Sequence, residues 1–197
     1  GRGIDYAIID KCVREGIIFE SLPYHNIVFI GNDNNGEPKY AAYRATNNSR
    51  IMGDCTGSDK HYSFRLALGN ADSVHLFESA IDLLSYATLM KIDCKNYESE
   101  SLLSLAGVYA PRDRIEESKV PVSLEEFLKE KPQITKIILH LDNDKAGRLA
   151  TKALQAVLSS RYEVIDEPAT RGKDFNDFLC FKMGIERTPT RERSYER

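Results

Sequence analysis

Tryptophan is absent from this chain of 197 residues, and its four cysteines lie far apart in the sequence. None of them forms a close pair of the kind that zinc sites and disulfide frameworks use, so we expect free thiols in a reducing compartment. Long apolar runs are also lacking, and the first residues do not have the apolar core of a signal peptide. The sequence therefore predicts a cytoplasmic protein that does not associate with membranes.

The chain has little net charge. Its formal charge is −3, which excludes a protein that attracts nucleic acid through a large overall positive charge. The acidic excess lies in residues 71–184, which carry 15 Lys and Arg against 19 Asp and Glu. An acid-rich region that binds a polyanion needs a cation between the two, and a divalent metal ion is the usual one.

The first third of the chain has the pattern of a small α+β unit. Apolar residues at helical spacing predict a helix over residues 4–16, which ends at a glycine. Residues rich in β-formers predict strands at 17–19, 26–30, 39–45 and 62–66. The polar stretch 32–36 between the second and third strands is typical of a hairpin turn. We expect this unit to occupy residues 1–70.

From residue 71 the pattern changes to strands that alternate with helices. The expected strands are residues 74–77, 102–105, 136–141 and 162–165, and the expected helices are residues 80–91, 124–129, 145–160 and 174–183. Alternation of this kind, with continuously apolar strands, predicts a parallel sheet covered by helices on both faces. We place this second domain at residues 71–184. Residues 185–197 are charged and unpatterned, which is typical of a linker.

Acidic residues follow the predicted strands at the points where helices begin. Glu78 follows the first strand, Asp142 and Asp144 follow the third, and Asp174 opens the last helix. Because the carboxyl ends of parallel strands meet at one edge, these side chains are expected to gather there. Their oxygens suit magnesium or manganese. Asp82 is expected either to bind metal through water or to face solvent, and Asp174 either to bind metal or to cap its helix.

Two of these segments resemble a known family. Residues 76–82 (LFESAID) and 141–148 (LDNDKAGR) resemble the two defining motifs of Toprim domains, which are found in bacterial-type primases, topoisomerases and OLD-type and RecR-like repair proteins. Ser79 stands where primases usually carry Gly. Residues 172–179 (GKDFNDFL) are similar to the Lys-Asp-x-Asn motif that closes the domain in primases. The resemblance implies a Rossmann-like, four-stranded parallel sheet flanked by helices and preceded by a small α+β subdomain.

Residues 43–46 and 57–64 resemble the region that precedes the Toprim domain in primase-like proteins of plasmids and conjugative elements. The resemblance implies a metal-dependent nucleotidyl transferase that makes primers during replication of a mobile element. Its ligands would be a single-stranded DNA template and nucleoside triphosphates, and its partner a helicase or another replication protein. Two alternatives stay open: a Toprim nuclease of the OLD type, in which the same carboxylates activate water, and a non-catalytic nucleic-acid-binding module.

The resemblance also assigns roles to residues. The expected catalytic residues are Glu78, Asp142, Asp144 and Lys173. The expected ligands of magnesium or manganese are Glu78, Asp142, Asp144, Asp82 and Asp174. The expected ligands of nucleic acid or nucleotide are Arg44, Lys60 and Lys173, which lie in the resembling segments, and Arg65, which is proposed from its charge alone as part of a basic strip facing phosphates.

Aromatic residues and one histidine are expected to be structural. Tyr40, Tyr43, Tyr62 and Phe64 are interpreted as core residues rather than as platforms for stacked bases. His140, which lies in an apolar strand just before the Asp pair, is interpreted as a hydrogen-bonded core histidine rather than as a metal ligand.

Overall fold

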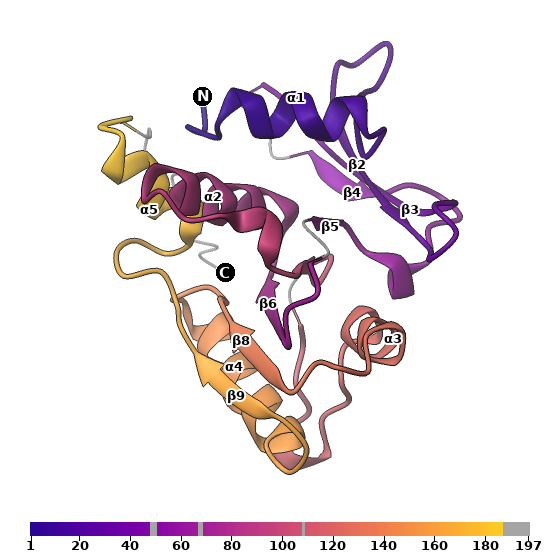
Figure 1. Ribbon diagram of the computed structural model, residues 1–197, viewed down its shortest axis with the longest axis vertical. Helices are drawn as coiled ribbons and strands as arrows, with labels where there is room; N and C mark the ends of the chain where they lie inside the picture. The colour runs from indigo at the N-terminus through magenta and orange to yellow at the C-terminus, as the bar shows by residue number, and fades with distance from the viewer. Residues whose placement is uncertain (48–50, 67–68, 108, 187–197) are drawn as a thin grey trace, which may run out of the picture.

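A computed structural model describes residues 1–47, 51–66, 69–107 and 109–186 of the chain. The first part contains helix α1 (Tyr6–Arg14) and a four-stranded antiparallel sheet in the order β1-β2-β3-β4 (Figure 1). The strands are β1 (Ile18–Glu20), β2 (Ile27–Asn32), β3 (Pro38–Arg44) and β4 (Met52–Asp54). Asp5 caps α1, since its side chain accepts hydrogen bonds from the backbone N–H groups of Ala7 and Ile8.

The second part is built on a five-stranded sheet in the order β5-β7-β6-β8-β9. Its strands are β5 (Arg65–Leu66), β6 (Ser73–Phe77), β7 (Leu102–Ser104), β8 (Lys136–Leu139) and β9 (Glu163–Asp166). The last four strands in this order are parallel, and β5 pairs antiparallel with β7. The helices are α2 (Ala80–Ile92), α3 (Val122–Glu130), α4 (Lys145–Leu158) and α5 (Phe175–Lys182), with short 3-10 turns η1 (Lys60–Tyr62), η2 (Tyr97–Ser99) and η3 (Ile115–Glu117).

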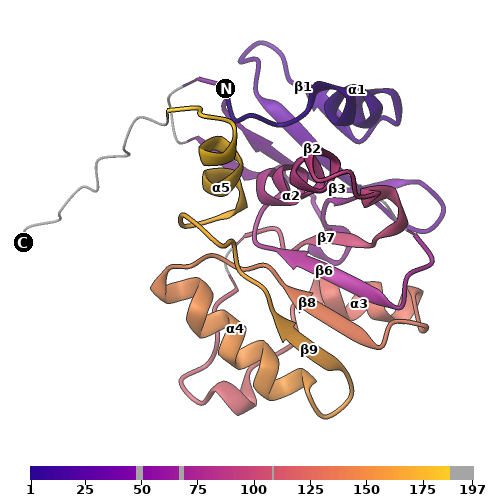
Figure 2. The same cartoon turned by 60° about the vertical axis from the view of Figure 1, so that its left-hand side comes forward.

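Helices cover both faces of the second sheet (Figure 2). On strand β6, Val74 and Leu76 point into a core shared with α3 and α4, whereas Phe77 points into a core shared with α2 and α5. This alternation along one strand is what a sheet buried on both faces requires. The α2 core also contains Ile8 of α1 and Phe29 of β2, so the antiparallel sheet packs onto the helical layer of the parallel one.

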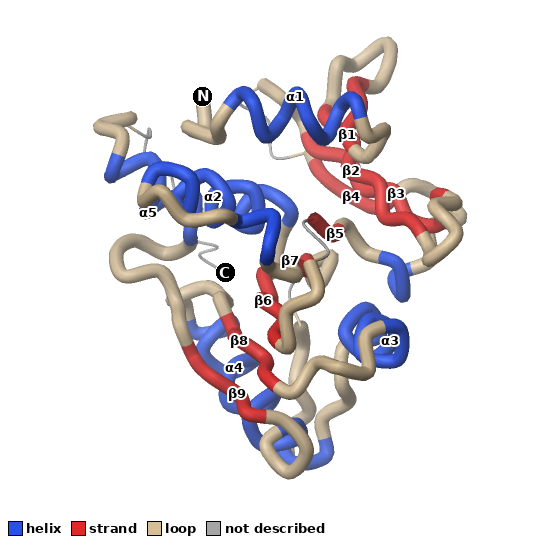
Figure 3. Tube along the Cα trace, in the orientation of Figure 1, coloured by secondary structure: helices blue, strands red, loops and turns tan. Residues whose placement is uncertain are grey.

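The fold class predicted from the sequence is confirmed, with two differences in detail. Strand β4 was not expected, and the predicted strand at residues 62–66 is divided into a 3-10 turn and the two-residue strand β5 (Figure 3). Strand β5 precedes residue 70 and nevertheless joins the second sheet, because Arg65 and Leu66 pair with Leu103 and Leu102. The division at residue 70 stays a prediction, and most of the predicted linker, residues 187–197, lies outside the described residues.

No helix in the described ranges is both long enough and apolar enough to cross a membrane.

Candidate functional site

The acidic residues after β6 and β8 meet at the carboxyl edge of the parallel sheet. These two strands are neighbours in the sheet, with Leu76 opposite Leu139. As a result Glu78, which follows β6, reaches the segment that follows β8, and its Oε1 accepts a hydrogen bond of 3.2 Å from the backbone N–H of Asp142. The two motifs are therefore in direct contact, as the shared edge of parallel strands predicts.

A glycine allows this contact. Asp144 caps helix α4, because its Oδ1 accepts a hydrogen bond of 2.9 Å from the backbone N–H of Gly147. A Cβ atom at Gly147 would lie 2.2 Å from the carbonyl oxygen of Asp142 and 2.8 Å from Glu78 Oε1. Only glycine lets the first turn of α4 come this close to the carboxylates, which explains the Ala-Gly pair in the second motif.

Lys173 joins the same group of carboxylates. Its Nζ lies 2.8 Å from Asp142 Oδ2 and 3.1 Å from Asp144 Oδ2. The loop that carries it is held in place, since the backbone N–H of Asn143 donates a hydrogen bond of 2.7 Å to the carbonyl of Lys173. The two ion pairs outweigh partial burial and hold the pKa of Lys173 above its ordinary value.

Negative charge in this group exceeds what Lys173 neutralises. Glu78 is only 7% exposed, and burial together with repulsion from Asp142 raises its pKa to about 7. Burial also raises the pKa of Asp142, although Lys173 acts against this effect. Asp144 differs, because the backbone N–H of Gly147 stabilises its charged form and lowers its pKa. A pair of carboxylates with raised pKa values gains stability when a further cation approaches.

Asp82 is buried beside this group, so the expectation that its side chain faces solvent is wrong. It is 7% exposed, its Oδ2 accepts a hydrogen bond of 2.6 Å from Ser79 Oγ, and its Oδ1 accepts one of 3.3 Å from the backbone N–H of Asn176. Burial and the nearby charge of Asp174 raise the pKa of Asp82. Asp174 caps helix α5 through a hydrogen bond of 2.7 Å from the backbone N–H of Asp177. A metal-binding role for Asp82 or Asp174 stays a prediction.

The chemistry of the donor set fits magnesium or manganese, because every donor is a carboxylate oxygen and the two buried ones have raised pKa values. The side chains, in the positions that they occupy, do not form a metal-binding site. Within the part of the chain that the structure describes, no group of three or more His, Cys, Asp or Glu side chains could hold a metal ion as it stands. Asp142 and Asp144 are instead paired with Lys173. Metal binding at these carboxylates therefore stays a prediction.

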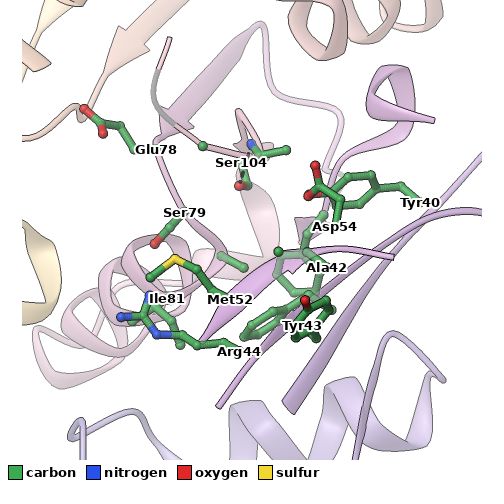
Figure 4. A pocket seen from close by; sticks show the side chains of 16 residues that line it. Tyr40, Ala42, Tyr43, Arg44, Met52, Asp54, Glu78, Ser79, Ile81 and Ser104 are labelled. Carbon is green, nitrogen blue, oxygen red and sulfur yellow. Dashed lines mark hydrogen bonds between the residues drawn. The ribbon is translucent and has the colours of Figure 1, made fainter. Parts of the chain in front are cut away.

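A cavity of about 270 Å³ lies between the two sheets and reaches Glu78 (Figure 4). The β6–α2 junction and the segment after β7 form one wall, and strands β2, β3 and β4 with Phe64 form the other. Its lining residues are Phe29, Tyr40, Ala42, Tyr43, Arg44, Met52, Gly53, Asp54, Phe64, Glu78, Ser79, Ala80, Ile81, Ser104, Ala106 and Gly107. Most of this lining is apolar, so a ligand here would exchange water for aromatic and aliphatic contacts.

The basic residues predicted to bind phosphate differ in their surroundings. Arg44 lines the cavity, and its side chain has no hydrogen bond or ion pair with another described residue. Lys60 is paired with Asp54, at 2.9 Å between Nζ and Oδ2. Arg65 is 8% exposed and its Nη1 contacts Glu130 Oε2 at 2.5 Å. The charge of Arg65 is thus neutralised inside the protein, and we do not retain it as a phosphate ligand.

Three of the predicted core aromatics, Tyr40, Tyr43 and Phe64, also line the cavity, and Tyr43 and Tyr62 are only partly buried. Tyr40 is 3% exposed and Phe64 is 1% exposed, which confirms their assignment to the core, yet both have surface on the cavity wall. His140 is a hydrogen-bonded core histidine, as expected. Its Nδ1 donates a hydrogen bond of 2.6 Å to the carbonyl of Glu167, and its Nε2 lies 2.8 Å from Nδ1 of His75.

Sequence reasoning missed Arg148 as an organiser of this edge. Its Nη2 donates a hydrogen bond of 2.7 Å to the carbonyl of Leu141, and its Nε donates one of 3.0 Å to the carbonyl of Asp142. Its Nη1 also contacts both carboxylate oxygens of Asp166, at 2.9 and 3.0 Å. Arg148 therefore joins the ends of β8 and β9. The sequence signal was its position directly after the Ala-Gly pair.

A parallel sheet with acidic residues at adjacent strand ends, opening toward a small antiparallel unit, defines a Toprim-type protein. Comparison with known families agrees with this class. Residues 75–179 match the family described as Toprim-like, and residues 1–71 match a family described as a protein of unknown function (DUF3991). The first match covers more than half of the chain, and the chain belongs to the Toprim-like family.

The chain is also similar to an uncharacterized protein of Bacillus anthracis, with 26% identity over 209 residues. This similarity covers 99% of the present chain and 52% of the Bacillus protein. The chain thus spans about half the length of that relative.

Solved structures of primases share the fold. The primase fragment of the bacteriophage T7 primase-helicase has a TM-score of 0.56 at 20% identity, covering 90% of this chain and 66% of that one. A DNA primase domain from Pseudomonas aeruginosa has a TM-score of 0.51 at 16% identity, covering 90% and 56%. A T7 assembly of lagging-strand DNA polymerase with primase domains bound to an RNA/DNA hybrid and dTTP has a TM-score of 0.55 at 21% identity, covering 89% and 80%. At these identities the similarity shows the fold alone.

Proposed function

We propose that the chain is a metal-dependent nucleotidyl transferase of the primase type, which joins nucleoside triphosphates on a single-stranded DNA template. One observation carries this proposal. Glu78, at the centre of the acidic edge, lines the same cavity as Arg44 and the aromatic residues of the antiparallel sheet. A nucleotide needs this combination, because its phosphates bind cations and its base binds apolar and aromatic surface.

Glu78, Asp142 and Asp144 would hold magnesium or manganese, and Asp82 and Asp174 would be further ligands of the same metal site. A metal ion bound there would neutralise phosphate charge as the new phosphodiester forms. The chain itself supplies the rest of the recognition. Arg44 would contact a phosphate at the cavity wall, and Lys173 would contact another from the acidic edge. Tyr43 and Met52 offer apolar surface for the base or ribose.

The wider setting is part of the same proposal. The T7 structures that share the fold belong to a primase-helicase and to an assembly of primase domains with a DNA polymerase. By analogy we propose that this chain is the catalytic part of a replication protein of a mobile element, works beside a helicase or polymerase, and acts in the cytoplasm. We also propose that residues 1–70 and 71–184 are its two functional units.

A non-catalytic nucleic-acid-binding module is the second candidate. It is favoured by the pairing of Lys173 with Asp142 and Asp144, which leaves no ready metal group among the described residues. In such a module Arg44 and the cavity would bind nucleic acid without turnover.

Calorimetry with manganese distinguishes the two candidate functions, because the transferase is expected to bind the metal ion and the non-catalytic module is not. The double change Asp142→Asn and Asp144→Asn should abolish binding, since it removes both charges and keeps the side-chain volumes. The matched control is Glu116→Gln with Glu117→Gln, which removes two charges from exposed positions of turn η3. Unchanged affinity in the Asp142 and Asp144 variant would place the metal elsewhere. The absence of manganese binding to the wild-type chain would favour the non-catalytic module.

The reaction is tested with manganese, a single-stranded template and labelled nucleotides. We expect label in oligomers, and we expect Glu78→Gln to remove it while Glu116→Gln does not. Cleavage of the template that depends on Glu78, without oligomers, would replace the transferase with a nuclease of the OLD type.

A further inference from the structure

Both the oxygen and the nitrogen of the Asn176 side-chain amide, at the start of α5, form hydrogen bonds with residues that are distant in the sequence. Asn176 is 1% exposed. Its Oδ1 accepts a hydrogen bond of 2.9 Å from Nη1 of Arg2, and its Nδ2 donates one of 2.8 Å to the carbonyl of Arg2 and one of 3.0 Å to Oγ of Ser85. A buried amide with all of these partners joins α5, α2 and the first residues of the chain.

The backbone of the same residue contacts the acidic edge. The N–H of Asn176 donates a hydrogen bond of 3.3 Å to Oδ1 of Asp82, whose Oδ2 is held by Ser79 Oγ at 2.6 Å. Asn176 therefore holds Arg2 with its side chain and Asp82 with its backbone. Both contacts therefore depend on the position of this one residue.

The segment that Arg2 belongs to is attached independently at its far end. The N–H of Asp5 donates a hydrogen bond of 3.0 Å to Oγ1 of Thr88, and Asp5 Oδ1 lies 2.8 Å from Nζ of Lys91. Figure 2 shows this N-terminal segment running beside α5 and α2. It continues into α1 and so into the antiparallel sheet that forms one wall of the cavity. Residues 1–5 thus connect one unit of the protein to the acidic edge of the other.

We infer that Asn176 is a positioning residue for Asp82, and that its side chain can hold this position only because Arg2 and Ser85 brace it. The inference rests on the proposed metal site for its effect on function. It extends that proposal by assigning a role to the first residues of the chain, which carry none of the acidic motifs.

The test compares variants that loosen the same segment in different places. Asn176→Ala removes the braced amide and keeps the backbone N–H. Arg2→Met removes the guanidinium from the other side of the contact. The control is Thr88→Val, which frees the N–H of Asp5 and leaves the Asn176 amide intact. Each variant is measured by hydrogen exchange at the Asn176 N–H and by manganese calorimetry.

We expect Asn176→Ala to weaken manganese binding about tenfold or more, as is usual when a residue that orients a ligand is lost. Arg2→Met should act in the same direction, and the double variant should be no weaker than Asn176→Ala alone, since both changes remove one brace. Thr88→Val should leave the affinity close to that of the wild type. An equal loss in Thr88→Val would overturn the inference in favour of general loosening, as would unchanged affinity in both Asn176→Ala and Arg2→Met.

Failure of the proposed function gives a different result. If the wild-type chain binds no manganese, the metal proposal is refuted, and hydrogen exchange alone decides the positioning role. Faster exchange of the Asn176 N–H in Arg2→Met, but not in Thr88→Val, would support the brace. Unchanged exchange in Arg2→Met would refute it. If Asn176→Ala does not fold, Arg2→Met still provides both measurements.

Discussion

Replacement of Glu78 by Gln should stabilise the protein while it removes the proposed function. The pKa of Glu78 is raised from 4.5 to about 7 by burial and by Asp142. The folded state therefore binds more protons than the unfolded state between these two pH values, and the free energy of unfolding falls as pH rises through this window. At about 1.4 kcal/mol for each pH unit, the full cost is about 3 kcal/mol and is present above pH 7.

Gln removes this cost without removing the hydrogen bond. Its Oε1 can accept from the backbone N–H of Asp142 as Glu78 does now. Urea unfolding with a chelator present should thus show Glu78→Gln to be more stable than the wild type by up to about 3 kcal/mol at pH 8. The difference should disappear near pH 4, where Glu78 is protonated in both states.

Glu116→Gln, in the exposed turn η3, is the control for a general change in net charge. A wild-type protein that is as stable as Glu78→Gln at pH 8 in the chelator would refute the reasoning. It would mean that Lys173 or solvent already compensates the charge of Glu78.

Three further predictions concern other parts of the site. Gly147→Ala should destabilise the protein by about 1–3 kcal/mol in urea unfolding, because its Cβ would meet backbone at 2.2 Å, although alanine normally stabilises a helix by about 1 kcal/mol relative to glycine. A gain in stability would contradict this. Glu130→Gln should lower the free energy of unfolding by about 3–5 kcal/mol, because it leaves the buried Arg65 without a counter-charge. The nucleotide affinity of the folded protein at matched salt should not change. Arg44→Ala should weaken nucleotide binding and lower the slope of log affinity against log salt concentration by about one. The control Lys39→Ala, in which the lost charge is paired with Asp33, should change this slope little. Equal slopes for the two variants would show that Arg44 does not contact the nucleotide.

The local pattern of the sequence was sufficient to predict most of the helices and strands and the grouping of the acidic residues, although it missed strand β4. Strand β8, which is buried on both faces, has a continuous run of branched aliphatic residues, and parallel strands end at a common edge. The contact between Glu78 and Asp142 follows from these two rules, and Gly147 follows from the closeness of that contact.

Only the tertiary structure shows which basic side chains are not neutralised inside the protein and can therefore bind phosphate. Arg44 and Arg65 look alike in the sequence, since both lie in predicted strands of the first unit. Arg65 is neutralised by Glu130, 65 residues away, whereas Arg44 faces the cavity. The contact between Asn176 and Arg2 spans 174 residues. Local periodicity encodes which face of an element is buried, but the partner on that face is set by how distant elements pack, and no spacing in the sequence records that choice.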